Sequence, residues 1–269
     1  MIPLQSPFQA KLSLTKIIST HSFRGGTGKS NITANLSVLI ARAGYRVGVI
    51  DTDIQSPGIH VLFRVNEESL AHSLNDYLWG RCPIEAAAVD VSERCIGALD
   101  EVSGRPRLFL IPSSLKPGEI ARILREGYDV ARLNDGLQDL IRRLQLDYLL
   151  IDTHPGVNEE TLLSIAVSDI LLLIVRPDQQ DLQGTAVAVE LARKLAVPQM
   201  FLLVNKVLAG TDLEDLQENV QSLFKTEVLA ALTLNNEMVR MASSDIFCNR
   251  HPRHPFTTDL ERVAARLIG

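Results

Sequence analysis

The ten residues from Ser22 to Asn31 read SFRGGTGKSN and follow the apolar stretch TKIIST at 15–20. The glycines of this segment allow backbone N–H groups to converge on phosphate oxygens, and the helix expected after them directs its positive end toward the same anion. Lys29 is then expected to reach the β and γ phosphates of a nucleotide, and the Ser30 hydroxyl to ligate Mg²⁺. An ordinary glycine-rich turn is the alternative. The order of strand, loop and helix favours a phosphate-binding loop.

The rest of the chain alternates short apolar runs with longer amphipathic stretches. This alternation is typical of βαβ units on a mostly parallel sheet, whose strands are apolar throughout because helices cover both faces. The expected strands are TKIIST (15–20), RVGVID (46–51), RLFLIP (107–112), YLLID (148–152), ILLLIV (170–175), MFLLVN (200–205) and a short one near 228–232. Helices are expected at 28–43, 129–145, 179–196, 211–224 and 257–268.

The segment from 54 to 105 is less regular and gives no clear boundaries. Within it, SLAHSLNDYLWG (69–80) and PIEAAAV (83–89) are interpreted as helices.

Length, composition and charge indicate which classes of protein this chain can belong to. With 269 residues and 46% hydrophobic residues, the chain can bury a core without disulfides. A formal charge of −5 argues against a surface that binds nucleic acid all over, although it leaves a local basic patch open. The three cysteines, Cys82, Cys95 and Cys248, form no CxxC pair and are expected to be reduced thiols of a cytoplasmic protein.

Neither a targeting segment nor a membrane span is expected. Residues 1–14 lack the charged start and apolar core of a signal peptide and are interpreted as a loose lead-in. The longest apolar run, at 170–175, is far too short to cross a bilayer and is interpreted as a buried strand.

Two strand ends supply the acidic groups that a nucleotide-hydrolysing site needs. VIDTDIQSPG places Asp51 at the last position of an apolar strand and Asp53 just beyond it. DYLLIDTHPG places Asp152 at the end of another strand, where a Walker B aspartate stands. The alternative for each is a helix N-cap or a turn residue, and this alternative is most open for Asp53.

A third buried strand is followed by VNKV at 204–207. Here Asn205 can hydrogen-bond the edge of a purine while the lysine stem packs on the ring. Asparagine after a strand is also a turn former, so this motif gains specificity only from the others.

Four segments, RGGTGKSN, DTDIQSPG, LDYLLIDTHPG and LLVNKV, occur in this order and together resemble the MinD/ParA family of deviant Walker A ATPases over roughly residues 15–268. The doubled glycine and the DxD after the second strand are specific to this group. The resemblance implies a single doubly wound P-loop domain at 15–269 that binds ATP and Mg²⁺ and forms a face-to-face, ATP-dependent homodimer.

The family also implies an activity and partners. Hydrolysis of ATP to ADP and phosphate is expected to be slow until a small activator or adaptor protein stimulates it. The dimer is expected to dock on nucleoid DNA or on a membrane and to position or partition a cargo.

The resemblance assigns roles to individual residues. Lys29 binds phosphates, Ser30 binds Mg²⁺, and Asp53 orients the attacking water. Asp51 and Asp152 hold magnesium-bound waters, and Asn205 touches adenine. The nucleotide-binding loop is formed by Arg24, Gly25, Gly26, Thr27, Gly28, Lys29, Ser30 and Asn31.

The sequence departs from the family pattern at two places in these motifs. The family has lysine before the glycine pair, which reaches the partner's nucleotide across the dimer, and this chain has Arg24. A guanidinium is suited to the same contact, with altered dimer geometry or rate, whereas the alternative is a solvated flank. His154 replaces the first proline of switch II and is interpreted as a polar residue that fills the proline's space.

Proteins that share this fold have other functions, which are alternatives to the expected ATPase. Iron-sulfur carriers need cysteines that bridge a dimer axis, and switch II and the segment after it contain none. A protein tyrosine kinase would carry a tyrosine-rich tail, but only Tyr45, Tyr77, Tyr128 and Tyr148 are present. An ATP-binding scaffold with little hydrolysis is the other alternative.

The C-terminal region gives no clear docking surface. The apolar stripe of 256–269 carries both signs of charge on its polar face, so a core-packing helix is favoured over a membrane anchor. The arginines around CNRHPRHP (248–255) are interleaved with acids, which indicates a solvated surface as readily as a nucleic-acid site. A metal site at His251 and His254 lacks further ligands.

Overall fold

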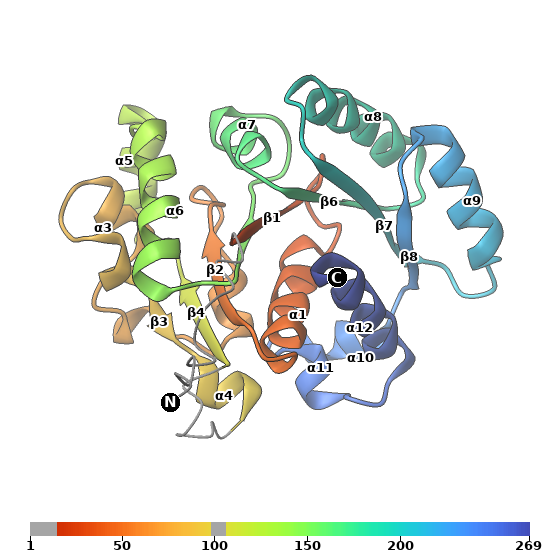
Figure 1. Ribbon diagram of the computed structural model, residues 1–269, viewed down its shortest axis with the longest axis horizontal. Helices are drawn as coiled ribbons and strands as arrows, with labels where there is room; N and C mark the ends of the chain where they lie inside the picture. The colour runs from red at the N-terminus through yellow and green to blue at the C-terminus, as the bar shows by residue number, and fades with distance from the viewer. Residues whose placement is uncertain (1–14, 98–105) are drawn as a thin grey trace, which may run out of the picture.

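The computed structural model describes residues 15–97 and 106–269, and the expected lead-in at 1–14 lies outside these residues. Its strands form one eight-stranded sheet in the order β3-β4-β2-β5-β1-β6-β7-β8 (Figure 1). Neighbouring strands are parallel except for β3, which pairs antiparallel with β4 at the edge. The expected doubly wound, mostly parallel sheet in a single domain is confirmed.

The strands lie close to where the sequence predicts them. Their bounds are β1 Lys16–His21, β2 Arg46–Asp51, β3 Val89–Asp90, β4 Arg107–Ile111, β5 Tyr148–Asp152, β6 Ile170–Val175, β7 Gln199–Val207 and β8 Val228–Thr233. Only the two-residue β3 was not expected. In the centre of the sheet β1 lies between β5 and β6, and Asp51 of β2 pairs in register with Asp152 of β5.

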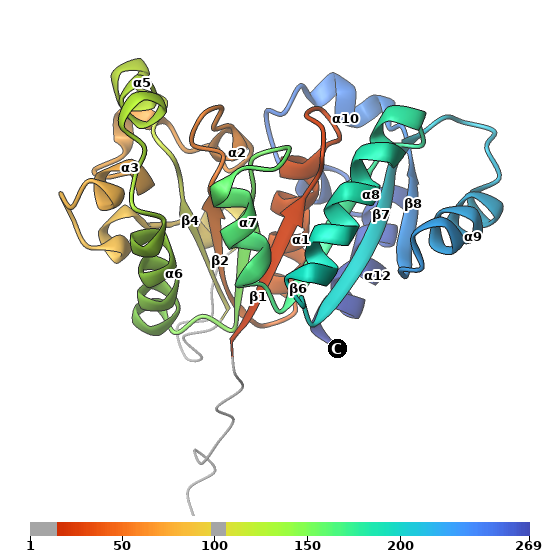
Figure 2. The same cartoon turned by 90° about the horizontal axis from the view of Figure 1, so that it is seen from above.

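Helices cover both faces of the sheet (Figures 1 and 2). One face packs against α1 and α12, and the other against α6, α7, α8 and α9. The helix bounds are α1 Lys29–Arg42, α2 Ile59–Leu62, α3 Leu74–Leu78, α4 Ser92–Ile96, α5 Pro117–Glu126, α6 Val130–Leu144, α7 Glu159–Ala166, α8 Gln179–Lys194, α9 Leu213–Phe224, α10 Asn236–Met241, α11 Phe247–Arg250 and α12 Pro255–Ile268.

The segment from 54 to 105, which the structure describes up to residue 97, differs from its prediction. The helix expected at 69–80 is reduced to α3, because the Asp76 carboxylate accepts the backbone N–H of Ser73 at 2.9 Å and fixes the helix start there. The helix expected at 83–89 is a 3₁₀ turn at Ile84–Ala87. The helices α2, α4, α5, α7, α10 and α11 were not predicted, and most of them are too short for a periodic pattern.

The last helix packs into the core, as the sequence favours. The stripe of α12 that includes Leu260, Val263 and Leu267 is buried, and the helix contacts α1 and β8. In 15–97 and 106–269, no helix has both the length and the apolar character needed to cross a bilayer.

Candidate functional site

The loop between β1 and α1 has the backbone conformation that its glycines permit. Gly26 and Gly28 have φ values of +77° and +95°, in the left-handed region that other residues rarely adopt. A Cβ atom on Gly28 would also lie 2.6 Å from Nδ2 of Asn205. Glycine is therefore required at position 28 both by conformation and by the close approach of β7.

Neighbouring strand ends hold this loop in place. Asn205 donates from Nδ2 to the carbonyl oxygen of Thr27 at 2.8 Å, and Lys206 donates from Nζ to that of Gly26 at 2.6 Å. The pairing of β7 with β8 is irregular between Val204 and Val207, and Lys206 has a φ of +60°. Such an irregularity redirects side chains, and here it brings two consecutive residues to the loop.

The side chain of Lys29 is buried beneath the loop and forms an ion pair with Asp152. Its Nζ lies 2.8 Å from Oδ1 of Asp152, and the exposed fractions of the two side chains are 7% and 1%. Thr33, one turn further along α1, donates to the same carboxylate oxygen at 3.2 Å. The expected phosphate-binding lysine and the expected Walker B aspartate are therefore in direct contact.

Asp51 lies beside this pair without a cation of its own. Its carboxylate accepts the backbone N–H groups of Asp53 at 3.0 Å and Gly58 at 3.2 Å. Burial and the neighbouring carboxylate of Asp152 raise the pKa of Asp51 to about 8, and Lys29 offsets only part of this. Two buried carboxylates thus share one ammonium group, so Asp51 retains a proton at neutral pH unless a further cation joins the cluster.

The donor set at this position fits Mg²⁺. Magnesium prefers hard oxygen ligands and is usually held by one or two carboxylates, waters and substrate phosphates. Asp51 and Asp152 could provide the carboxylates, and Ser30, which lines the adjoining cavity, could provide a hydroxyl. Among the residues that the structure describes, no group of three or more His, Cys, Asp or Glu could hold a metal ion.

Asp53 contacts His154 across the two loops that follow β2 and β5. The distance from Nδ1 of His154 to Oδ1 of Asp53 is 2.6 Å. Both residues line the cavity in front of the phosphate-binding loop. The hydrogen bond between these two side chains was not expected from the sequence.

Arg24 is exposed at the tip of the loop, where Nη1 donates to Oε1 of Gln180 on α8. Beside it, the ring of Phe23 packs on Gly184 so closely that a Cβ there would lie 2.1 Å from Cδ1 of the ring. The helix α8 thus supports the start of the loop. Arg24 stays on the surface, where a second molecule could reach it.

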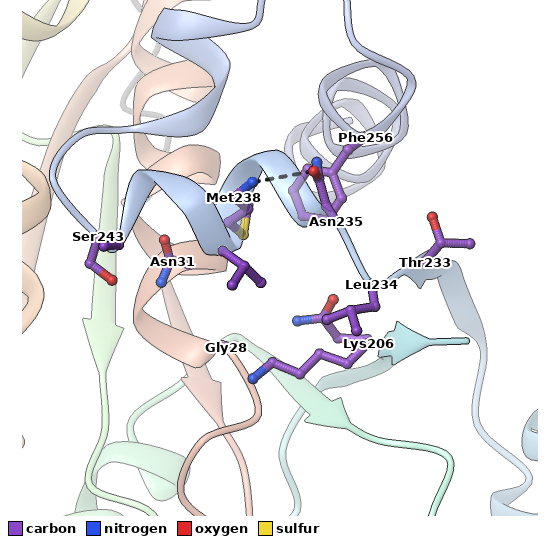
Figure 3. Close-up of a pocket in the computed structure, with 12 residues that line it drawn as sticks. Gly28, Asn31, Lys206, Thr233, Leu234, Asn235, Met238, Ser243 and Phe256 are labelled. Carbon is purple, nitrogen blue, oxygen red and sulfur yellow. Dashed lines mark hydrogen bonds between the residues drawn. The ribbon is translucent and has the colours of Figure 1, made fainter. Parts of the chain in front are cut away.

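Two cavities adjoin at the loop. The first, about 370 Å³ in volume, is lined by the residues from Gly25 to Asn31 together with Asp53, His154 and Pro155. The second, about 190 Å³, lies between the loop, the end of β7 and α10 (Figure 3). Gly28, Asn31 and Ser243 line both cavities, so the two form one continuous groove.

The second cavity combines apolar and amide groups. Its lining includes Leu234, Met238 and Phe256 (Figure 3). Val239 and Asn205 also line it, and Oδ1 of Asn205 takes no part in the bond to Thr27. An apolar slot with a few polar groups at its edge suits a flat heterocycle. The α10 wall was not predicted from the sequence, although Asn235, which caps α10 by accepting the N–H groups of Glu237 and Met238, is a recognisable helix-start signal.

The other candidate ligands of the sequence do not gather at this groove. Cys95 and Cys248 are buried, and burial raises the pKa of each thiol to about 12. All three cysteines are free. His251 stacks on Phe247 with ring centroids 4.7 Å apart, and Nδ1 of His254 accepts the N–H of Phe256, so both histidines serve the packing of α12.

Comparisons with known proteins agree with this geometry. The sequence matches the family model described as the CobQ/CobB/MinD/ParA nucleotide binding domain over residues 18–246. The fold is similar to that of the septum site-determining protein MinD of Pyrococcus horikoshii, solved with Mg-ADP, with a TM-score of 0.76 at 20% identity and coverage of 94% of this chain and 96% of that one.

The proteins of similar sequence have names that describe different functions. The chain is 23% identical to an uncharacterised ATP-binding protein of Methanocaldococcus jannaschii, over 94% of this chain and 87% of that one. It is 28% identical to the flagellum site-determining protein YlxH of Helicobacter pylori, over 95% and 82%. It is also 26% identical to an iron-sulfur cluster carrier protein of Pyrococcus furiosus, over 70% and 60%.

Proposed function

The chain belongs to the CobQ/CobB/MinD/ParA nucleotide-binding family, and on this premise we propose that it is an ATPase that dimerises with bound ATP. It hydrolyses ATP slowly to ADP and phosphate, and the cycle positions or partitions a cellular cargo. The relative that determines the flagellar site supports a positioning role.

One observation carries this proposal: the buried cluster of Lys29, Asp152 and Asp51 behind the phosphate-binding loop. The loop offers N–H groups and a lysine to phosphates, and the two carboxylates can ionise together only when a further cation joins them. Magnesium bound with a nucleotide supplies that charge and neutralises the charge on the phosphates. A site for a phosphate alone would not require a buried pair of carboxylates.

Each residue then has a task. Lys29 leaves Asp152 and binds the β and γ phosphates, while the N–H groups of the loop from Gly25 to Ser30 surround them. Asp51, Asp152 and Ser30 hold the metal and its waters. Asp53, which lines the cavity, orients the attacking water.

The second cavity supports a nucleoside as the rest of the ligand. Its apolar wall suits the faces of adenine, and Oδ1 of Asn205 is an acceptor for the exocyclic amine. Lys206, whose Nζ is bonded to the loop, brings its stem to the same cavity.

Dimerisation through this face is supported by Arg24, which is exposed beside the cavity and donates to a neutral side chain, Gln180. A guanidinium at the rim of a phosphate site is suited to reach the nucleotide of a second copy. The partner protein that stimulates turnover, and the membrane or nucleoid surface on which the dimer docks, belong to the same proposal.

Two rivals are disfavoured by observations on this chain. None of its four tyrosines is exposed, so an autophosphorylated tail has no acceptor in the structure. Two of its three cysteines are buried thiols of raised pKa, which is unsuited to a carried iron-sulfur cluster. Only the rate of ATP hydrolysis distinguishes the proposed ATPase from a scaffold that binds ATP without turnover.

The proposal is tested by measuring Mg²⁺-dependent phosphate release and molecular mass together, in ATP and in ADP. We expect a dimer only in ATP and slow release that needs magnesium. A monomer in ATP, or release that EDTA does not stop, would overturn the proposal.

A further inference from the structure

The hydrogen bond between His154 and Asp53 joins the loop after β5 to the loop after β2. The second of these loops carries the aspartate that is proposed to orient the attacking water. Asp53 follows β2 and His154 follows β5, and the two strands are neighbours in the sheet. The side chains are largely buried, with exposed fractions of 13% for Asp53 and 24% for His154. A carboxylate oxygen accepts hydrogen bonds, so Nδ1 of His154 is assigned as the donor.

The backbone on both sides of His154 is anchored. The Thr153 hydroxyl donates to the carbonyl oxygen of Thr20 at 3.0 Å, and the carbonyl oxygen of His154 accepts from Oγ1 of Thr161 at 3.3 Å. Gly156 donates its N–H to the carbonyl oxygen of Ser22 at 3.2 Å, at the start of the phosphate-binding loop. The imidazole ring is therefore attached to a support that spans β1, α7 and that loop.

A buried histidine strengthens this support. The Thr153 hydroxyl has one proton, which it gives to Thr20, so its oxygen accepts the Nδ1–H of His21 at 2.8 Å. His21 is fully buried, and burial together with nearby Lys29 lowers its pKa to about 3. The neutral ring of His21 thus holds the residue before His154 directly behind the site.

Asp53 has little support from its own loop. The backbone N–H of Ser56 donates to Oδ1 at 3.1 Å, and the bond from His154 ends on the same oxygen. Two donors on one oxygen fix the rotation of a carboxylate. Oδ2, which neither bond uses, is then the oxygen available to a water in the cavity that Asp53 lines.

From this geometry we infer that His154 is a positioning residue, which fixes the carboxylate of Asp53 for the attacking water and couples the loop after β5 to hydrolysis. The inference rests on the proposed ATPase function. The family pattern described above has proline at this position, and proline has no side-chain donor. This chain therefore uses a side-chain bond between the two switch loops where that pattern provides none.

Steady-state ATP hydrolysis by His154→Ala tests the inference. We expect kcat to fall by about ten-fold or more while the KM for ATP stays within about two-fold, because the lost bond to a charged group acts on the water and not on nucleotide binding. His154→Asn should restore most of kcat, because its amide nitrogen can take the place of Nδ1. In an Asp53→Ala background, His154→Ala should have no further effect.

The matched control is His72→Ala, which removes a partly buried histidine that lines a small separate cavity beside α3. It should hydrolyse ATP like the wild type. An unchanged or higher kcat in His154→Ala, or independent losses in the double variant, would overturn the positioning role.

A second readout does not require turnover. In ¹⁵N-histidine NMR of the nucleotide-free chain, the proton on Nδ1 of His154 should be visible and should shift or vanish in Asp53→Ala. If the wild type hydrolyses no ATP, the proposed function fails and the positioning role fails with it. If the wild type hydrolyses ATP but the NMR signal does not respond to Asp53→Ala, the inference alone fails.

Discussion

The Nζ atom of Lys29 lies 2.8 Å from Oδ1 of Asp152, behind the loop between β1 and α1. Lys29 is also the residue proposed to bind the phosphates of the nucleotide. Lys29 therefore has a buried carboxylate as its partner, with which the phosphates of a nucleotide would compete. Binding of a nucleotide must replace this partner with phosphate oxygens, and the carboxylate that is released must find another cation. The geometry thus links the proposed lysine contact with the proposed metal contact, because one cannot form without the other.

Lys29→Ala should bind ATP at least about 100-fold more weakly, since a buried cation that pairs with phosphates is removed. Isothermal titration measures the loss, and circular dichroism checks that the variant folds. Lys194→Ala, which removes an exposed charge from α8, is the control and should bind like the wild type. Tight binding by folded Lys29→Ala would contradict the assigned role.

The stability of the nucleotide-free protein should depend on pH through Asp51. Its pKa is about 8 in the fold and near 4 in an unfolded chain, so the folded state holds an extra proton between these values. The free energy of unfolding should therefore fall as pH rises from about 4 to about 8, by up to about 1.4 kcal/mol per pH unit. Urea unfolding across this range measures the slope.

Asp51→Asn should remove this contribution and unfold at higher urea than the wild type at pH 8, since an amide carries no charge to bury. Asp135→Asn, at an exposed position of α6, should leave the slope unchanged. If wild type and Asp51→Asn have parallel pH profiles, Asp51 is not the group that carries the extra proton.

Much of the fold and the position of the candidate phosphate-binding loop could be predicted from the sequence because both rest on local patterns. RVGVID and YLLID each combine an apolar strand with a terminal aspartate, and parallel pairing then brings Asp51 and Asp152 into register. By contrast, the wall formed by α10 is one short helix without a periodic pattern. Its place beside Gly28 depends on how α12 and β8 pack, which no local pattern encodes.

Side-chain contacts between residues far apart in the sequence could not be predicted either. Asp53 and His154 are 101 residues apart, and their bond depends on the conformations of two loops. The sequence marked His154 only as a residue in the place of a proline. In the structure it is a donor to the very aspartate that the family resemblance assigns to the water, and that role stays a prediction.

Met238→Ala should weaken ATP binding by about five- to ten-fold, because part of the apolar wall of the second cavity is lost. Binding of inorganic tripolyphosphate should not change, since this ligand has no base. Leu223→Ala, an exposed apolar residue on α9, is the control. An equal loss for both ligands would show that Met238 supports the loop and does not contact the base.

Arg24→Ala should bind ATP but fail to form the ATP-dependent dimer, whereas Arg24→Lys should form it, because a positive charge at the rim is what the contact needs. Light scattering in ATP measures the mass. Arg253→Ala, which removes another exposed arginine, should dimerise normally. Normal dimerisation of Arg24→Ala would mean that its guanidinium only flanks the loop.

The most direct test of the proposed ATPase is the turnover of Mg-ATP by the wild type and by Asp53→Ala at saturating ATP. The proposal predicts slow but measurable release of phosphate by the wild type and a loss of about 100-fold or more in Asp53→Ala, with ATP affinity unchanged. Equal rates in the two proteins, or no turnover by either, would contradict it.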